Sequence, residues 1–176
     1  MVSAVQKAEQ RPAPPTAEER EPMFDLIELL FFAYRDFVGD ADRLLEAMRF
    51  GRAHHRVLHF VSRNPGLTIA ELLDILRITK QSLARVLKEL VDQGFIEARA
   101  GSVDRRQRLL YLSPKGRKLA QQLTHLQSQR FVRALDELPA DARGHARAFL
   151  LAMIDPAERE KVAALVDPPH REGKAP

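Results

Sequence analysis

Apolar residues recur every three or four positions over several long stretches of this 176-residue chain. That spacing is the period of an amphipathic α-helix. It predicts helices over residues 23–49, 51–63, 68–76 and 79–93, and three more after residue 113. A bend or interruption of the first helix is expected at Gly39. The apolar surface of this helix is wider than burial against its own subunit requires, so we expect it to meet a second partner, such as another copy of the chain.

Capping residues mark the third and fourth predicted helices. Thr68 and Glu71 have the S/T-x-x-E spacing of a capping box, in which each side chain bonds to the other residue's backbone N–H. Thr79 caps the fourth helix, and Gly94 stands where a left-handed residue ends it. A short capped helix, a tight turn and a second capped helix together predict a helix-turn-helix.

The hydrophobic period changes after Gly94. Residues 95–100 ("FIEARA") alternate between apolar and polar, and residues 108–113 ("RLLYLS") form a second predicted strand. The polar loop "GSVDRRQ" joins them into a β-hairpin with a basic tip. Ser113 and Pro114 then begin a long helix as its N-cap and first residue. The predicted fold is mainly α with a small β-hairpin wing, that is, a winged helix-turn-helix between helical segments.

Charge and composition narrow the function. Residues 77–118 contain 11 Lys and Arg against 4 Asp and Glu, a net of +7, whereas the whole chain carries +4 and the remainder therefore −3. Concentrated basic charge is typical of nucleic-acid binding, although a basic solvated surface would fit the charge equally well. The absence of cysteine excludes disulfides and thiolate chemistry. No apolar run reaches the roughly 18 residues of a membrane span and the N-terminus is no secretory signal, so we expect a soluble, cytoplasmic protein.

The helix over residues 79–93 carries the candidate DNA-reading residues, because an α-helix fits the major groove. Thr79 and Ser82 are expected to bond phosphates and Lys80 to neutralise one. Gln81 is expected to read adenine and Arg85 guanine. An arginine at the hairpin tip would enter the minor groove. The alternative is a winged helix that contacts protein rather than DNA.

Two motifs resemble the MarR family of bacterial transcription regulators. They are "DRRQR" (104–108) followed by "LSPKG" (112–116), and "LVDQGFIEA" at the end of the recognition helix. The match covers residues 51–123, and residues 51–96 further resemble the alphaproteobacterial PetP/LdtR-like branch. The resemblance implies a homodimer whose terminal helices interlock as a helical dimerisation domain. It also implies repression at a pseudo-palindromic operator, and release of the protein by a small aromatic or anionic effector.

The resemblance assigns roles to individual residues. It places recognition in Thr79, Lys80, Gln81, Ser82 and Arg85. Arg106 would enter the minor groove, Asp104 would orient the wing arginines, and Arg105 and Arg108 would bind phosphates. The candidate effector residues lie between the dimerisation and DNA-binding lobes, although aromatic residues at this spacing are commonly core; they are Phe31, Tyr34, Arg35, His54, His55 and Arg56.

Other chemistry finds less support in the sequence. His55 and His59 have the i, i+4 spacing of a metal pair, but residues 51–70 contain no carboxylate. A structural role is the commoner one for such a pair, and a metal- or haem-responsive regulator stays an alternative. We expect no metal, no cofactor and no catalytic residues, hence no enzyme. The predicted organisation is a disordered tail (1–22), a dimerisation helix (23–50), the DNA-binding domain (51–113), C-terminal dimerisation helices (114–167) and a second disordered tail (168–176).

Overall fold

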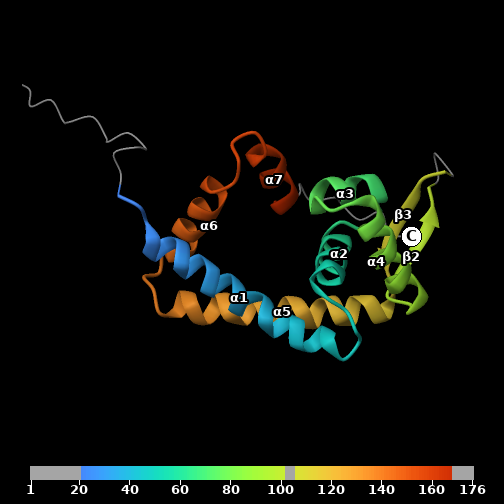
Figure 1. Cartoon of the computed structure of the whole chain (residues 1–176), viewed down its shortest axis with the longest axis horizontal. Coiled ribbons are helices and arrows are strands. Elements are labelled where there is room, and N and C mark those ends of the chain that lie inside the picture. The colour runs from blue at the N-terminus through green and yellow to red at the C-terminus, as the bar shows by residue number, and fades with distance from the viewer. Residues whose placement is uncertain (1–20, 102–105, 168–176) are drawn as a thin grey trace, which may run out of the picture. The chain divides into compact units, whose positions relative to one another are not determined.

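The computed structural model describes residues 21–101 and 106–167 (Figure 1). Both predicted tails fall outside the described residues, apart from positions 21 and 22, as do Asp104 and Arg105 of the wing. The chain divides into two compact units, Met1–Asp36 and Phe37–Pro176. The described elements, in chain order, are α1 (Phe24–Glu46), α2 (Arg52–Arg63), β1 (Leu67–Thr68), α3 (Ile69–Leu76), α4 (Lys80–Asp92), β2 (Ile96–Ala100), β3 (Arg108–Leu112), α5 (Pro114–Asp136), α6 (Ala142–Ala152) and α7 (Arg159–Val166).

The helices and the hairpin agree with the sequence predictions, and the fold class is confirmed. Of the two possibilities expected at Gly39, an interruption is wrong, because α1 is one continuous helix from Phe24 to Glu46. Glycine costs a helix about 1 kcal/mol relative to alanine. Burial of Val38, Ala41 and Leu45 on either side offsets that cost.

The wing belongs to a three-stranded antiparallel sheet of order β1-β3-β2. The hairpin pairs Ile96 with Leu112 and Ala100 with Arg108. On the other side of β3, Leu67 pairs with Leu110. The sequence predicted the hairpin but missed β1, because a strand of two residues has no alternation to detect. This short strand fixes the start of α3 to the sheet that carries the wing.

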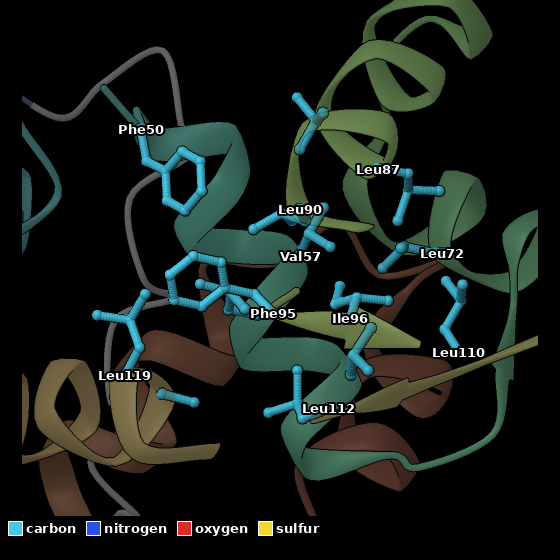
Figure 2. Close-up of a cluster of buried hydrophobic side chains, with 14 of the residues drawn as sticks. Phe50, Val57, Leu72, Leu87, Leu90, Phe95, Ile96, Leu110, Leu112 and Leu119 are labelled. Atoms are coloured by element: carbon cyan, nitrogen blue, oxygen red, sulfur yellow. The ribbon is translucent and has the colours of Figure 1, made fainter. Parts of the chain in front are cut away.

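One hydrophobic core holds α2, α3, α4, the sheet and the first turns of α5 together (Figure 2). Leu119 and Leu123 of α5 are buried in it, as is Phe50, which precedes α2. The side chains that lie almost wholly inside include Val57, Leu58, Val61, Leu72, Leu83, Leu90, Ile96 and Leu110. Helix α4 therefore packs its apolar side against this core.

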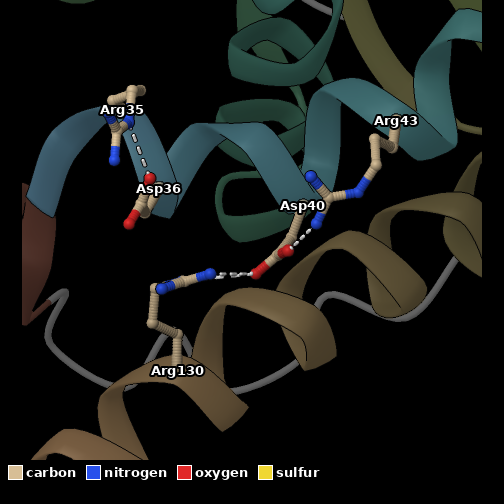
Figure 3. Close-up of polar contacts among 5 residues, drawn as sticks. All are labelled: Arg35, Asp36, Asp40, Arg43 and Arg130. Carbon is tan, nitrogen blue, oxygen red and sulfur yellow. Dashed lines mark hydrogen bonds and ion pairs between the residues drawn. The ribbon is translucent and has the colours of Figure 1, made fainter. Parts of the chain in front are cut away.

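The second half of α1 is fixed to α5 by charge as well as by packing. Arg130 donates from Nε and Nη2 to Asp40 Oδ2, at 3.2 and 2.8 Å, and Arg43 pairs with the other carboxylate oxygen (Figure 3). The hydrogen bond from Arg130 is the main cause that lowers the pKa of Asp40 below its ordinary value. Phe37 and Phe131 meet edge to face, with ring centroids 5.4 Å apart. None of the helices described here is both long and apolar enough to cross a membrane.

Candidate nucleic-acid interface

The turn of the helix-turn-helix is set by a cap on α3 and a left-handed residue behind it. Thr68 Oγ1 accepts from the Glu71 N–H at 3.2 Å, and Glu71 Oε2 accepts from the Thr68 N–H at 2.8 Å, as the capping box predicted. Arg77 ends α3 at φ 52°, ψ 43°. Its N–H donates to Leu73 O at 2.9 Å. Arg56 reaches the same turn from α2, where Nη2 donates to Leu76 O at 3.0 Å.

Helix α4 begins at the predicted cap. Thr79 Oγ1 accepts from the Ser82 N–H at 3.1 Å and its hydroxyl donates to Ser82 Oγ at 3.0 Å. One hydroxyl hydrogen of this pair is used in the bond between them, so the other hydroxyl hydrogen remains for an outside acceptor such as a phosphate oxygen.

The front of α4 is an open, basic surface, which we call the recognition face: Lys80, Gln81 and Arg85. All three side chains are exposed, while the opposite side of the helix is buried in the core. Among the described residues, neither Lys80 nor Arg85 forms a salt bridge. Positive charge here is thus free to meet an anionic partner.

The acidic side chains of α4 contact residues outside the recognition face. Glu89 Oε2 lies 2.7 Å from His54 Nε2 of α2, and Asp92 pairs with Lys88 within the helix. Both acids lie in the second half of α4, away from the recognition face. The electrostatic field in front of the helix is therefore dominated by Lys80 and Arg85.

His54 positions α4 from behind. Its Nδ1 accepts from the Gly51 N–H at 3.2 Å, so the ring hydrogen must be on Nε2, from which it donates to Glu89. The ring also stacks on Phe50, with centroids 4.5 Å apart and an interplanar angle of 10°. Sequence reasoning missed this role, because it grouped His54 with the effector residues.

The backbone pairing of the wing continues one residue beyond the end of each strand. Gly101 N–H donates to Gln107 O at 3.0 Å and closes the ladder. Arg99 pairs with Glu97 at 2.9 Å, and its guanidinium lies 4.7 Å from the centre of the Tyr111 ring. Arg106 and Arg108 are exposed at the end of the hairpin. Of the predicted wing residues, Asp104 and Arg105 lie outside the described residues.

The six predicted effector residues are spread over two units of the structure. Phe31, Tyr34 and Arg35 are exposed in the N-terminal unit, where Arg35 Nε donates to Asp36 at 2.8 Å (Figure 3). In the other unit His54 and His55 are buried. A cavity of about 540 Å³ between α2, α3 and α7 is lined by none of the six. A pocket made of these residues stays a prediction.

His55 and His59 share one side of α2, as their spacing predicted. Burial lowers the pKa of both imidazoles, and the proximity of His59 lowers that of His55 further. The described part of the chain contains no group of three or more His, Asp or Glu side chains able to hold a metal ion. His55 is buried, whereas His59 is only half-buried.

Comparison with known proteins shows which family the chain resembles. The model of the MarR family matches residues 50–107, which include the whole helix-turn-helix. The HTH-type transcriptional regulator PetP of Rhodobacter capsulatus is 45% identical over 141 residues, which cover 80% of this chain and 85% of PetP.

Solved structures share the fold. The FabT protein of Streptococcus pneumoniae, in complex with DNA, aligns with a TM-score of 0.66 at 17% identity over 75% of this chain and 94% of FabT. The Mycobacterium tuberculosis MarR family protein RV2887, in complex with salicylic acid, aligns with a TM-score of 0.55 at 23% identity over 78% of this chain and 99% of its own. The identity with PetP and the family match on the winged helix show that this chain is a DNA-binding transcriptional regulator of the MarR family.

Proposed function

We propose that the protein is a homodimeric repressor that binds a pseudo-palindromic operator and leaves it when a small ligand binds. The observation that carries the proposal is the recognition face at the start of α4, where Lys80, Gln81 and Arg85 are exposed. Within the part of the chain that the structure describes, neither Lys80 nor Arg85 forms a salt bridge. Binding to chromosomal DNA would place the protein in the cytoplasm.

The chemistry of the recognition face suits a major groove. Arg85 has the fork of donors that guanine O6 and N7 accept, and Gln81 has the donor and acceptor that pair with adenine. Lys80 and Ser82 would contact phosphates, which fix the position of the helix but read no sequence. Arg106 at the wing would enter the narrow minor groove, where A·T-rich DNA attracts arginine. Arg105 and Arg108 would bind phosphates beside it, with Asp104 as their carboxylate partner.

Exposed apolar side chains support the homodimer. Within the N-terminal unit, α1 exposes an unusually dense set of large side chains, namely Phe24, Leu26, Ile27, Leu29, Leu30, Phe31, Phe32 and Tyr34. The second unit exposes Phe131 and Val132 on α5, Phe149 and Leu150 on α6, and Met153 directly after α6. Apolar patches of this kind mark interaction sites. We assign them to a second copy, because two-fold symmetry would present two recognition helices to two half-sites.

Release by a ligand rests on similarity. RV2887, which shares the fold, binds salicylic acid, and a small aromatic or anionic effector is the corresponding proposal here. The candidate residues are the six that the sequence suggested, namely Phe31, Tyr34, Arg35, His54, His55 and Arg56. Binding of such a ligand would have to favour a state in which the two recognition helices no longer match their half-sites.

The test is a titration of a DNA fragment from the protein's own promoter region, followed by fluorescence anisotropy at about 50 and 200 mM salt. Affinity should fall steeply with salt, because several phosphates release counterions on binding. Arg85→Ala should cost about 1–3 kcal/mol of binding and relax the base preference at one position per half-site. Arg143→Ala removes the same charge from an exposed site on α6 and should bind like wild type. Wild-type affinity of both Arg85→Ala and Arg106→Ala would refute the assignment.

A further inference from the structure

Helix α7 contacts the helix-turn-helix through charged side chains. Arg77 Nη2 lies 2.8 Å from Oε1 of Glu158, the residue that precedes α7. Lys161, one turn further on, pairs with Asp74 in the last turn of α3. Figure 1 shows α7 (red) facing α3. The hydrogen bond from Lys161 lowers the pKa of Asp74, and the hydrogen bond to Glu158 raises that of Arg77.

Arg77, one of the paired residues, has an unusual backbone conformation in the turn between α3 and α4. Arg77 has φ 52°, a left-handed conformation that side chains other than glycine and asparagine avoid. Such a residue persists where its surroundings over-determine it. Its backbone is held by Leu73 O, the preceding carbonyl by Arg56, and its guanidinium by Glu158. The first two contacts come from α3 and α2, and only the contact with Glu158 comes from the C-terminal segment.

The contact between α7 and α3 is charged rather than close-packed. A cavity of about 540 Å³ separates them, lined by Phe60 and Ile75 on one side and by Val162 and Leu165 on the other. Because the paired side chains are about half exposed, breaking either pair leaves no buried charge behind. The contact can therefore be removed without loss of the hydrophobic core.

We propose that Glu158 and Lys161 are positioning residues for DNA binding, which act through Arg77 and Asp74 to hold the turn before the recognition helix. The inference rests on the proposed function and adds a route by which the C-terminal helix controls it. Helix α4 begins three residues after Arg77, so a change in the turn re-aims the whole recognition face. Exposed ion pairs are individually weak, and the expected loss of affinity for each is about two- to fivefold.

The experiment compares charge reversals on α7 in the full chain, with the promoter fragment as the probe. Glu158→Lys should weaken binding about two- to fivefold. Glu160→Lys makes the same charge change in the same helical turn at an exposed residue and should bind like wild type. Lys161→Asp should also weaken binding. The exchange Asp74→Lys/Lys161→Asp restores the pair with its net charge unchanged, and should recover affinity.

A second measurement separates this inference from the proposed function. Hydrogen exchange at the Arg77 amide, which donates to Leu73 O, should be faster in Glu158→Lys than in Glu160→Lys whether or not the promoter fragment binds. In an Arg77→Gly background, Glu158→Lys should have no further effect on affinity. Equal affinities and equal exchange of the two α7 variants would overturn the inference. So would tighter binding by Glu158→Lys, or the same loss in the Arg77→Gly background.

Discussion

Gly116 in the first turn of α5 lies against the backbone of Phe95. A Cβ at this position would lie 2.0 Å from Phe95 O and 3.0 Å from the carbonyl carbon of Phe95. The same carbonyl oxygen accepts the Ser113 N–H at 3.0 Å. Because the clash is with backbone, no change of rotamer can relieve it, and Gly116→Ala must displace either α5 or the residue that joins α4 to β2.

The size of the effect follows from two opposing contributions. Alanine favours a helix over glycine by about 1 kcal/mol. Overpacking costs about 1–3 kcal/mol and occasionally more, and a separation of 2.0 Å from a backbone oxygen lies at the severe end. Weakening of the hydrogen bond from Ser113 adds about 1 kcal/mol. We expect a net loss of about 2–3 kcal/mol, which for a chain of this length lowers Tm by roughly 4–12 °C.

Thermal unfolding followed by circular dichroism provides the assay, and α6 provides the control. Gly144 occupies the same position after its N-cap as Gly116, but a Cβ there has no neighbour within 4 Å. Gly144→Ala should therefore raise the stability by about 0.5–1 kcal/mol through helix propensity alone. If Gly116→Ala melts at or above the wild-type temperature, the described contact between α5 and the end of α4 is incorrect.

Three further outcomes are expected. Because burial lowers the pKa of His55 and His59, the unfolded chain binds protons more readily, so the free energy of unfolding should decrease as the pH falls below about 6.5. Denaturant titrations at several pH values should show a weaker pH dependence of the free energy of unfolding in the double variant His55→Gln/His59→Gln. An unchanged pH dependence in that variant would contradict the role of the two histidines. Glu89→Ala leaves the His54 Nε2–H without its acceptor and should cost about 1–2 kcal/mol in the same titrations, whereas wild-type stability would argue against the bond. Asp40→Asn should lower Tm at neutral pH but not below the depressed pKa of this carboxylate, where the aspartate itself is protonated; an equal loss at both pH values would exclude the ion pair as its cause.

Much of the fold could be predicted because it is encoded by local spacing. The caps at Thr68 and Thr79 depend on contacts three residues apart, and the buried side of α4 depends on a repeat of three and four. The same repeat predicted that the opposite side of α4, which carries the recognition face, is exposed. Strand β1 escaped detection because its partner β3 lies more than 40 positions away in the sequence, and no local pattern encodes such a pairing.

The contacts that aim the recognition helix could not be predicted, because they join residues far apart in the chain. His54 and Glu89 are 35 positions apart, and Asp74 and Lys161 are 87 apart. Arg77 gave no local indication of its left-handed conformation, since glycine or asparagine is the usual residue there. A weak signal existed for Glu89, an acid in the second half of a helix whose exposed front is basic. Its partner, the imidazole of His54, could not be identified from the sequence.

Sequencing of the DNA that is crosslinked to the protein in cells tests the central claim most directly. A two-fold pair of recognition helices predicts an enriched pseudo-palindrome whose half-sites are about 10–10.5 base pairs apart, centre to centre. Arg85→Ala should retain the spacing but lose preference at one symmetric position in each half. Recovery of no common sequence, or of a single asymmetric site insensitive to Arg85→Ala, would contradict the account.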